Sequence, residues 1–113
     1  MPVNSYNNIV YFQRADFSTV LNVGEATAPE TFEFATNLWY AHDDPGQSDP
    51  SGELSTPESG GIYGQDPAFI DDQYRIDNGS PAAAMGTELA EVTGDRGGDC
   101  YGQPPAIGAW SVQ

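Results

Sequence analysis

The stretch after residue 41 carries the densest group of side chains able to bind a metal ion: His42, Asp43, Asp44, Asp49 and Glu53. Carboxylate oxygens are the ligands that Ca²⁺ prefers in proteins, so this stretch has enough ligands for a site in principle. Their spacing does not match an EF-hand loop, because the order Asp-x-Asp-x-Asp-Gly is absent. We therefore predict a solvated loop and no cofactor, with Ca²⁺ binding as the alternative.

A second acidic group follows at Asp66, Asp71, Asp72 and Asp77. Asp66 precedes Pro67, and an aspartate in that position ordinarily starts a turn. The paired carboxylates of glycosidases lie about 5 to 9.5 Å apart across a sugar. Neighbours such as Asp43 and Asp44 point apart in an extended chain, and no other pair can be placed from the sequence. We expect turns from these acids and not catalysis.

Other catalytic groups are scarce. A polysaccharide lyase needs a basic side chain near the substrate carboxylate, yet the chain has no Lys and only Arg14, Arg75 and Arg96, none of them in the acidic stretch. Arg75 fits a strand surface, paired with a carboxylate. A Ser-His-Asp system would depend on His42, the sole histidine, inside an exposed loop. Enzyme function is therefore disfavoured, and no catalytic, cofactor-binding or metal-binding residue is assigned.

Aromatic side chains on either side of the acidic stretch are the sharpest remaining candidates. Trp39 and Tyr40 precede it and Tyr63 follows it. Rings with polar neighbours can form a stacking platform for a sugar. The alternative is that these rings are core, because the chain is poor in aliphatic residues. We predict that these three residues contact a glycan.

The elements that must position these side chains are strands. Helical periodicity is nearly absent, and short apolar runs separated by Gly, Pro, Asn and Asp recur. The first predicted strands are Ile9–Phe12, Thr19–Val23, Thr31–Phe34 and Leu38–Tyr40. Phe32 and Phe34 point to one face and Glu33 to the other. Val10 and Phe12 recur at one common offset as Phe32 and Phe34, which is either the spacing of a solenoid coil or a coincidence of closely spaced strands.

Residues 41–61 are rich in Asp, Ser, Pro and Gly, which predicts a long exposed loop. Strand-like pieces return at Ile62–Tyr63, Phe69–Ile70 and Tyr74–Ile76. One short helix is predicted, with Ser80 as N-cap, Pro81 at its first position and Gly86 as its stop. After an irregular tail, residues 107–110 are expected to form a last short strand.

Length and composition set limits on function. The chain has 113 residues, enough for one domain, and its 13 aromatic residues can replace many missing aliphatic ones in a core. A net charge of −14 repels nucleic acid and anionic lipid. No apolar run approaches the length of a membrane span. The single cysteine, Cys100, excludes an internal disulfide and is expected to be a bystander.

Four segments occur in a characteristic order: Gly64–Asp71, Tyr74–Ile76, Gly79–Ala82 with Gly86 shortly after, and Ile107–Trp110. In this order, over about residues 60 to 110, the chain resembles the carboxy-terminal end of right-handed parallel β-helix proteins of the pectate-lyase-like superfamily. The chain departs from the family at Ala106, where members usually carry an acidic residue, and in lacking their many upstream coils.

The resemblance implies an all-β chain, a short right-handed parallel β-helix-like solenoid with a C-terminal cap; a small antiparallel β-sandwich is the alternative. Residues 1–113 then form a single domain. Strand coils are expected at about 7–40, the acidic exposed loop at about 41–61, and a C-terminal coil and cap at about 62–113.

The first strand, Ile9–Phe12, is expected to leave an open edge, which predicts a homo-oligomer through the N-terminal edge. The predicted function is a non-catalytic structural or self-associating module. The alternatives are a carbohydrate-binding module, with a polysaccharide as partner, and a remnant of a polysaccharide-active enzyme. The segment Met1–Ser5 has no export signal, which predicts a cytoplasmic protein if this is the whole chain; the resembled family is often secreted.

Overall fold

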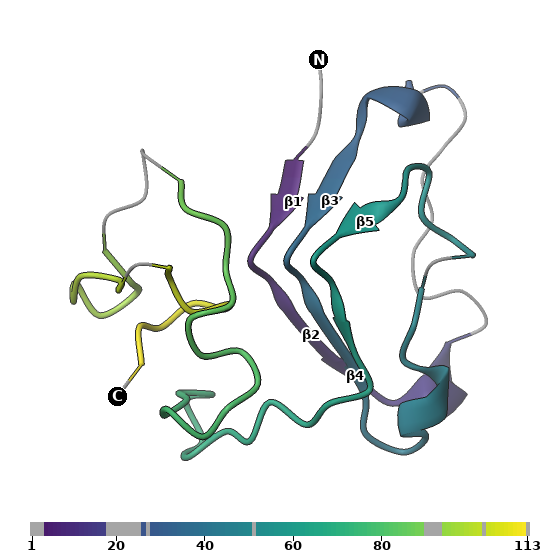
Figure 1. The fold of residues 1–113 in the computed structure, drawn as a ribbon. Coiled ribbons are helices and arrows are strands. Elements are labelled where there is room, and N and C mark those ends of the chain that lie inside the picture. Colours follow the sequence, from purple (N-terminus) through teal and green to yellow (C-terminus); the bar gives the residue numbers. More distant parts are fainter. Residues whose placement is uncertain are drawn as a thin grey trace.

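The computed structural model describes residues 4–17, 26, 28–50, 52–89, 94–102 and 104–112. Among these residues the regular elements are β-strands and single turns of 3-10 helix, so the chain is all-β, as predicted (Figure 1). Every pair of neighbouring strands is parallel. A small antiparallel sandwich is therefore wrong for the strands described. The predicted strand Thr19–Val23 lies outside the described residues.

The chain makes three passes, and each pass adds one strand to each of two parallel sheets, ordered β1-β3-β5 and β2-β4-β6. The strands are β1 (Asn4–Tyr6), β2 (Ile9–Phe12), β3 (Glu33–Ala35), β4 (Leu38–Ala41), β5 (Glu58–Ser59) and β6 (Ile62–Tyr63). The short 3-10 turns between passes are η1 (Arg14–Asp16), η3 (Pro29–Thr31) and η4 (Pro45–Gln47).

A sharp bend joins the two strands of each pass. The first bend residue has a left-handed backbone in every pass, with φ of 62° at Asn7, 53° at Thr36 and 69° at Gly60. Asn and Gly tolerate this conformation well, whereas a β-branched Thr adopts it only where its surroundings enforce it. The bends lie in line in Figure 1, so the three passes turn at the same place.

The register between passes corrects the predicted alignment of Val10 and Phe12 with Phe32 and Phe34. Ile9 pairs with Leu38, and Leu38 pairs with Ile62. Val10 lies beside Trp39, not beside Phe32. More residues separate Ile9 from Leu38 than Leu38 from Ile62, so the turns between passes differ in length. The bends, and not the apolar residue types, fix the alignment.

The main core lies between the C-terminal segment, which we define as residues 65–112, and the face of the β2-β4-β6 sheet that carries Leu38 and Ile62. Leu38 and Ile62 on the sheet pack with Ile76, Ala82, Ala106 and Ile107 of that segment. The opposite face of the sheet carries the buried side chains of Phe12 and Trp39. In Figure 1 the C-terminal segment, green to yellow, lies beside β1 and β2, on the side away from β5.

Several elements predicted after residue 64 do not form. The described parts of residues 65–112 contain turns and bends and no strand of the sheets, so the strands predicted at 69–70, 74–76 and 107–110 are wrong. The predicted helix is also wrong. Ser80 does accept a hydrogen bond from the Ala82 amide at 3.1 Å, as an N-cap would, but Ala84 is left-handed at φ 55°. One helical turn is too short to be stable by itself.

The predicted exposed loop at 41–61 is partly corrected. Most of its described residues are exposed, but Ala41 and Ser48 are buried, and Glu58 and Ser59 form β5. The Ser48 hydroxyl accepts a hydrogen bond from the Ala41 amide at 2.9 Å. The loop is thus held to the end of β4 at this point.

The N-terminal edge, predicted to be open, is contacted by the chain's own C-terminal segment. The Gly108 amide donates to the Asn7 carbonyl oxygen at 2.8 Å, and the Tyr11 and Phe69 rings lie 5.6 Å apart. The reason for expecting a second copy at this edge is weakened, because part of the edge is already occupied.

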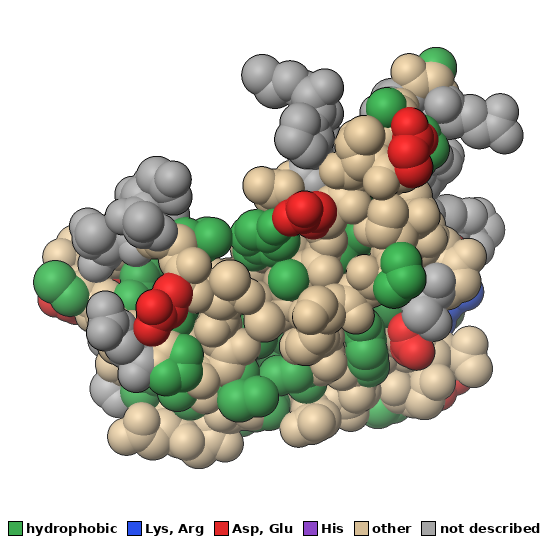
Figure 2. Space-filling model, turned by 45° about the horizontal axis from the view of Figure 1, so that its top comes forward, with side chains coloured by type: hydrophobic (Ala, Val, Ile, Leu, Met, Phe, Trp, Pro, Cys, Tyr) green, Lys and Arg blue, Asp and Glu red, His purple; other side chains and the backbone are tan. Residues whose placement is uncertain are grey.

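On the face that Figure 2 shows, acidic side chains are spread out and hydrophobic side chains form small groups between polar atoms. The high negative charge is therefore not gathered into one patch on this face. Within the described part of the chain, no helix has the length and apolar character to cross a membrane.

Candidate functional site

A cleft of about 550 Å³ lies between the first pass and the C-terminal segment. One wall comes from the bend after β1 and from β2, and comprises Asn7, Asn8, Ile9 and Tyr11. The other wall comes from the C-terminal segment, and includes Phe69, Gln73, Tyr74, Arg96 and Trp110. The two walls meet where the Gly108 amide donates to the Asn7 carbonyl oxygen.

A row of aromatic rings crosses from the sheet into this cleft. Tyr40 on β4 lies 5.6 Å from Tyr11 on β2, and Tyr11 lies 5.6 Å from Phe69. Phe69 in turn packs against Tyr74 at 5.2 Å. Tyr11 is 48% exposed and Tyr74 is 65% exposed. The cleft therefore offers aromatic surface to a ligand, and contacts with the other rings hold that surface in place.

Two of the three arginines of the chain lie over the ring of Trp110, and one of them, Arg96, also lines the cleft. The guanidinium carbons of Arg75 and Arg96 are each 5.5 Å from the centre of the Trp110 ring, a distance at which cation and ring attract one another. The Trp110 indole N–H donates to the Gln73 carbonyl oxygen at 2.9 Å. Positive charge thus collects around one ring in a chain whose net charge is −14.

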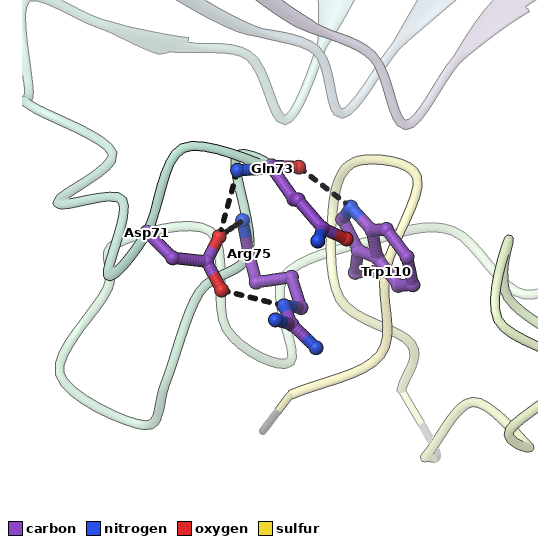
Figure 3. Close-up of polar contacts among 4 residues, drawn as sticks. All are labelled: Asp71, Gln73, Arg75 and Trp110. Carbon is purple, nitrogen blue, oxygen red and sulfur yellow. Dashed lines mark hydrogen bonds and ion pairs between the residues drawn. The ribbon is translucent and has the colours of Figure 1, made fainter.

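The two arginines differ in their partners. Arg75 Nε lies 2.6 Å from Asp71 Oδ2, and the other oxygen of Asp71 accepts the amides of Gln73 and Arg75 (Figure 3). Burial opposes ionisation of Asp71, but these hydrogen bonds lower its pKa. The exposed Arg96 forms no ion pair with any carboxylate in the described part of the chain. Arg96 is therefore the cation available to a ligand.

A hydrogen-bonded loop around Asp95 positions Arg96. Asp95 Oδ2 accepts the amide and the hydroxyl of Ser111, both at 2.7 Å, and Asp95 Oδ1 accepts the amides of Gly97 and Asp99. The Arg96 amide donates to the Ala109 carbonyl oxygen at 2.8 Å. Burial raises the pKa of Asp95, but these hydrogen bonds outweigh it and lower the pKa below its ordinary value of 3.8.

We expect acid to release this loop. Because the pKa of Asp95 is lower in the folded chain, its contribution to stability is complete above the ordinary value of 3.8 and is lost as the pH falls through the lower folded value. In strong acid, the protection of the Gly97 and Ser111 amides relative to their intrinsic exchange rates should therefore fall. Asparagine keeps one acceptor oxygen, so in Asp95→Asn at least one of these two amides should exchange fast already at pH 6. Asp72→Asn, which removes the same charge at an exposed position, should exchange like the wild type at pH 6 and in strong acid. Slow exchange of both amides in Asp95→Asn at pH 6 would contradict the assignment.

The three rings predicted to contact a glycan do not share one surface. Trp39 and Tyr63 pair in register on one face of their sheet, and Tyr40 points to the opposite face. Trp39 is only 4% exposed. Its indole N–H and the Tyr63 hydroxyl donate to Glu58 Oε1 at 2.9 and 2.7 Å. Burial, together with the bond to Glu58, raises the pKa of Tyr63. Of the three residues, only Tyr40 adjoins the aromatic row of the cleft.

The acidic residues mostly shape turns. Asp66, Asp71 and Asp77 each accept the backbone amide two residues ahead, which agrees with the predicted turns. Asp43 accepts the amides of Arg14 and Ala15, and these bonds, Arg14 first, lower its pKa. Cys100 is exposed. No group of three or more His, Cys, Asp or Glu side chains within the described ranges is placed to hold a metal ion. Ca²⁺ binding in the loop stays a prediction.

The sequence predicted none of the cleft's polar residues as ligand contacts. Asn8, Gln73 and Arg96 come from separate parts of the chain and meet only through the docking of the C-terminal segment. One signal was available at the bends, where Asn8-Ile9-Val10, Asn37-Leu38-Trp39 and Gly61-Ile62-Tyr63 repeat a small polar or glycine residue before two apolar ones. That repeat gives the register of the passes.

Comparison with known proteins adds no relative: no family model, no curated protein and no solved structure matches the chain.

Proposed function

We propose that the chain is a non-catalytic carbohydrate-binding module whose site is the cleft between the first pass and the C-terminal segment. We further propose that the three passes form a short parallel β-helix, as the resemblance to the pectate-lyase-like superfamily implies. The parallel pairing of the strands and the aligned bends support this architecture. In this arrangement β2 supplies a rigid wall, and the C-terminal segment supplies the wall that carries most of the polar contacts.

The observation that carries the proposal is the exposed aromatic surface beside polar groups in one cavity. Tyr11 and Tyr74 line the cleft together with the exposed amides of Asn8 and Gln73. A sugar ring presents an apolar face that can stack on an aromatic ring, and hydroxyls that bond to amides. Ligand sites commonly combine aromatic walls with a few polar groups in this way.

The lining of the cleft favours binding over catalysis. Its described residues include no Asp, Glu, His or Cys side chain. General acid and base catalysis of glycosidic cleavage uses such groups, most often a pair of carboxylates. A remnant of a glycosidase that works through paired carboxylates therefore gains no support from this site.

Arg96 gives the cleft a preference in charge. Its guanidinium can bond to a carboxylate in two-pronged geometry, and the Trp110 ring orients it. We expect a sugar that carries a carboxylate to bind more tightly than a neutral sugar of equal length. High salt should reduce that difference, because the site is exposed.

The test is calorimetric titration of the full chain with trigalacturonate and, as its neutral counterpart, cellotriose. Tyr74→Ala should weaken trigalacturonate binding about two- to twelvefold, since ring contacts contribute about 0.5 to 1.5 kcal/mol. Tyr74 is 65% exposed, so its loss should leave the fold intact. Met85→Ala is the control, since Met85 is 51% exposed and lies outside the cleft lining. The proposal fails if neither trisaccharide binds, or if Tyr74→Ala binds like the wild type.

Self-association stays a prediction. The contacts of Asn7 and Tyr11 with the C-terminal segment occupy part of the N-terminal edge on which it was based. At the opposite end, β5 and β6 are the last strands of their sheets. Sedimentation at high protein concentration distinguishes a monomer from an oligomer.

A further inference from the structure

The cleft exists only while two distant parts of the chain are held together. Asn7 to Tyr11 form one wall, and the nearest residue of the other wall in the sequence is Phe69. The polar connection between these walls centres on one residue, Asn7. Its side chain and its backbone both contact the C-terminal segment.

The Asn7 side chain pairs with a peptide group as a strand would. Its Nδ2 donates to the Thr87 carbonyl oxygen at 2.8 Å, and its Oδ1 accepts the Thr87 amide at 2.7 Å. The same Oδ1 accepts the Thr36 hydroxyl at 2.6 Å, which connects the second pass. The Asn7 carbonyl oxygen accepts the Gly108 amide at 2.8 Å. One residue therefore joins the first pass to the C-terminal segment at two places.

The residue type is tightly constrained at this position. The backbone is left-handed, with φ of 62°, which Asn and Gly tolerate and most other residues do not. The side chain must both donate and accept, which excludes Gly and an ionised Asp. Of Asn, Asp and Gly, which all tolerate this backbone, Asn alone satisfies both requirements.

We propose that Asn7 is the positioning residue of the cleft, holding the C-terminal segment at the distance from β2 that a ligand requires. The effect on ligand binding rests on the proposed function, whereas the effect on docking does not. A ligand that touches both walls binds best to the docked arrangement, so binding should in turn stabilise docking. Bound trigalacturonate should therefore slow amide exchange at Gly108.

The test compares full-length Asn7→Gly with Asn78→Gly, which removes the same side chain from an exposed position of the C-terminal segment. Glycine keeps the left-handed backbone, so only the side chain is lost. We expect amide exchange to accelerate roughly tenfold or more at Thr87 and also at Gly108. The amides of Ile62 and Gly64, which donate to Asn37 and Trp39 in the sheet, should remain protected. Trigalacturonate should bind roughly tenfold more weakly to Asn7→Gly, and as in the wild type to Asn78→Gly.

The exchange rate of the Gly108 amide distinguishes a positioning role of Asn7 from a purely local bond between Asn7 and Thr87. The Gly108 amide donates to the Asn7 carbonyl oxygen, which glycine retains, so faster exchange there reports loosened docking. Acceleration at Thr87 alone would overturn the proposal. If Asn7→Gly does not fold, Asn7→Asp takes its place, because it removes only the donor to Thr87 and is read at the same two amides. If the wild type binds neither trisaccharide, the proposed function fails, and the exchange rates still support or overturn the positioning role.

Discussion

Replacing Glu58 by glutamine is expected to lower the free energy of unfolding by about 3 kcal/mol. Glu58 on β5 accepts four hydrogen bonds: Oε1 accepts from Trp39 and Tyr63, and Oε2 accepts from the backbone N–H and side-chain Nδ2 of Asn37. A glutamine amide offers one oxygen and one NH₂ group. Its NH₂ group would face donors, and of these only the Tyr63 hydroxyl can turn to accept, so that the Trp39 indole N–H or both Asn37 donors lose their acceptor.

The penalty is large because the donors cannot turn to water. Asn37 is fully buried and Trp39 is 4% exposed. Asn37 also links the passes, since its Nδ2 donates to the Ser5 carbonyl oxygen at 2.8 Å and its Oδ1 accepts the Asn8 amide at 3.0 Å. Leaving a buried donor without its acceptor costs about 1 to 3 kcal/mol. A loss of this size is a large part of the stability of a small domain.

Urea unfolding followed by tryptophan fluorescence measures this effect, since Trp39 contacts Glu58 directly. The control is Glu88→Gln, the same chemical change at an exposed residue, which should alter stability by less than about 0.5 kcal/mol. Equal midpoints for the two variants would show that Glu58 does not hold the passes together.

The sequence predicted the strands better than their alignment. The apolar runs gave β2 with its observed bounds and β4 to within one residue, because alternation along a strand is a local property. β1 was not predicted, since Asn4–Tyr6 has only one large apolar side chain. The predicted alignment failed because Phe32 and Phe34 match Val10 and Phe12 in type, whereas the left-handed bends set the register.

The candidate site was less accessible to prediction than the strands. Trp39 and Tyr63 were proposed as ligand contacts because they flank a polar loop, but an internal carboxylate, Glu58, binds both. A half-buried acid that accepts hydrogen bonds from neighbouring strands cannot be recognised from a short segment such as Glu58–Ser59. The cleft residues Tyr11 and Arg96 lie far apart in the sequence, and only tertiary docking brings them to one cavity.

Gly108→Ala is expected to lower the free energy of unfolding by about 3 kcal/mol and to impair the cleft as well. Gly108 has φ of +110°, a backbone that side chains disfavour, and an added Cβ would lie 2.9 Å from Ile9 Cδ1. The amide of the same residue donates to the Asn7 carbonyl oxygen. The variant must therefore change its backbone, turn the Ile9 side chain aside or move away from β2, and the first and last of these changes separate the two walls.

Alanine variants of two other glycines separate the cost of backbone strain from the cost of steric contact. Gly98 has φ of +92° and nothing within 4 Å of an added Cβ, so Gly98→Ala has the backbone strain alone. Gly52 also has open space and no positive φ, so Gly52→Ala should change stability by less than about 0.5 kcal/mol. Strain alone costs about 1 to 3 kcal/mol, and overpacking adds a similar amount. If Gly108→Ala unfolds at the same urea concentration as Gly98→Ala, backbone strain alone explains the loss, and close contact between Gly108 and Ile9 does not contribute. A lower midpoint for Gly108→Ala, together with weaker trigalacturonate binding, would show that this contact holds the C-terminal segment against β2.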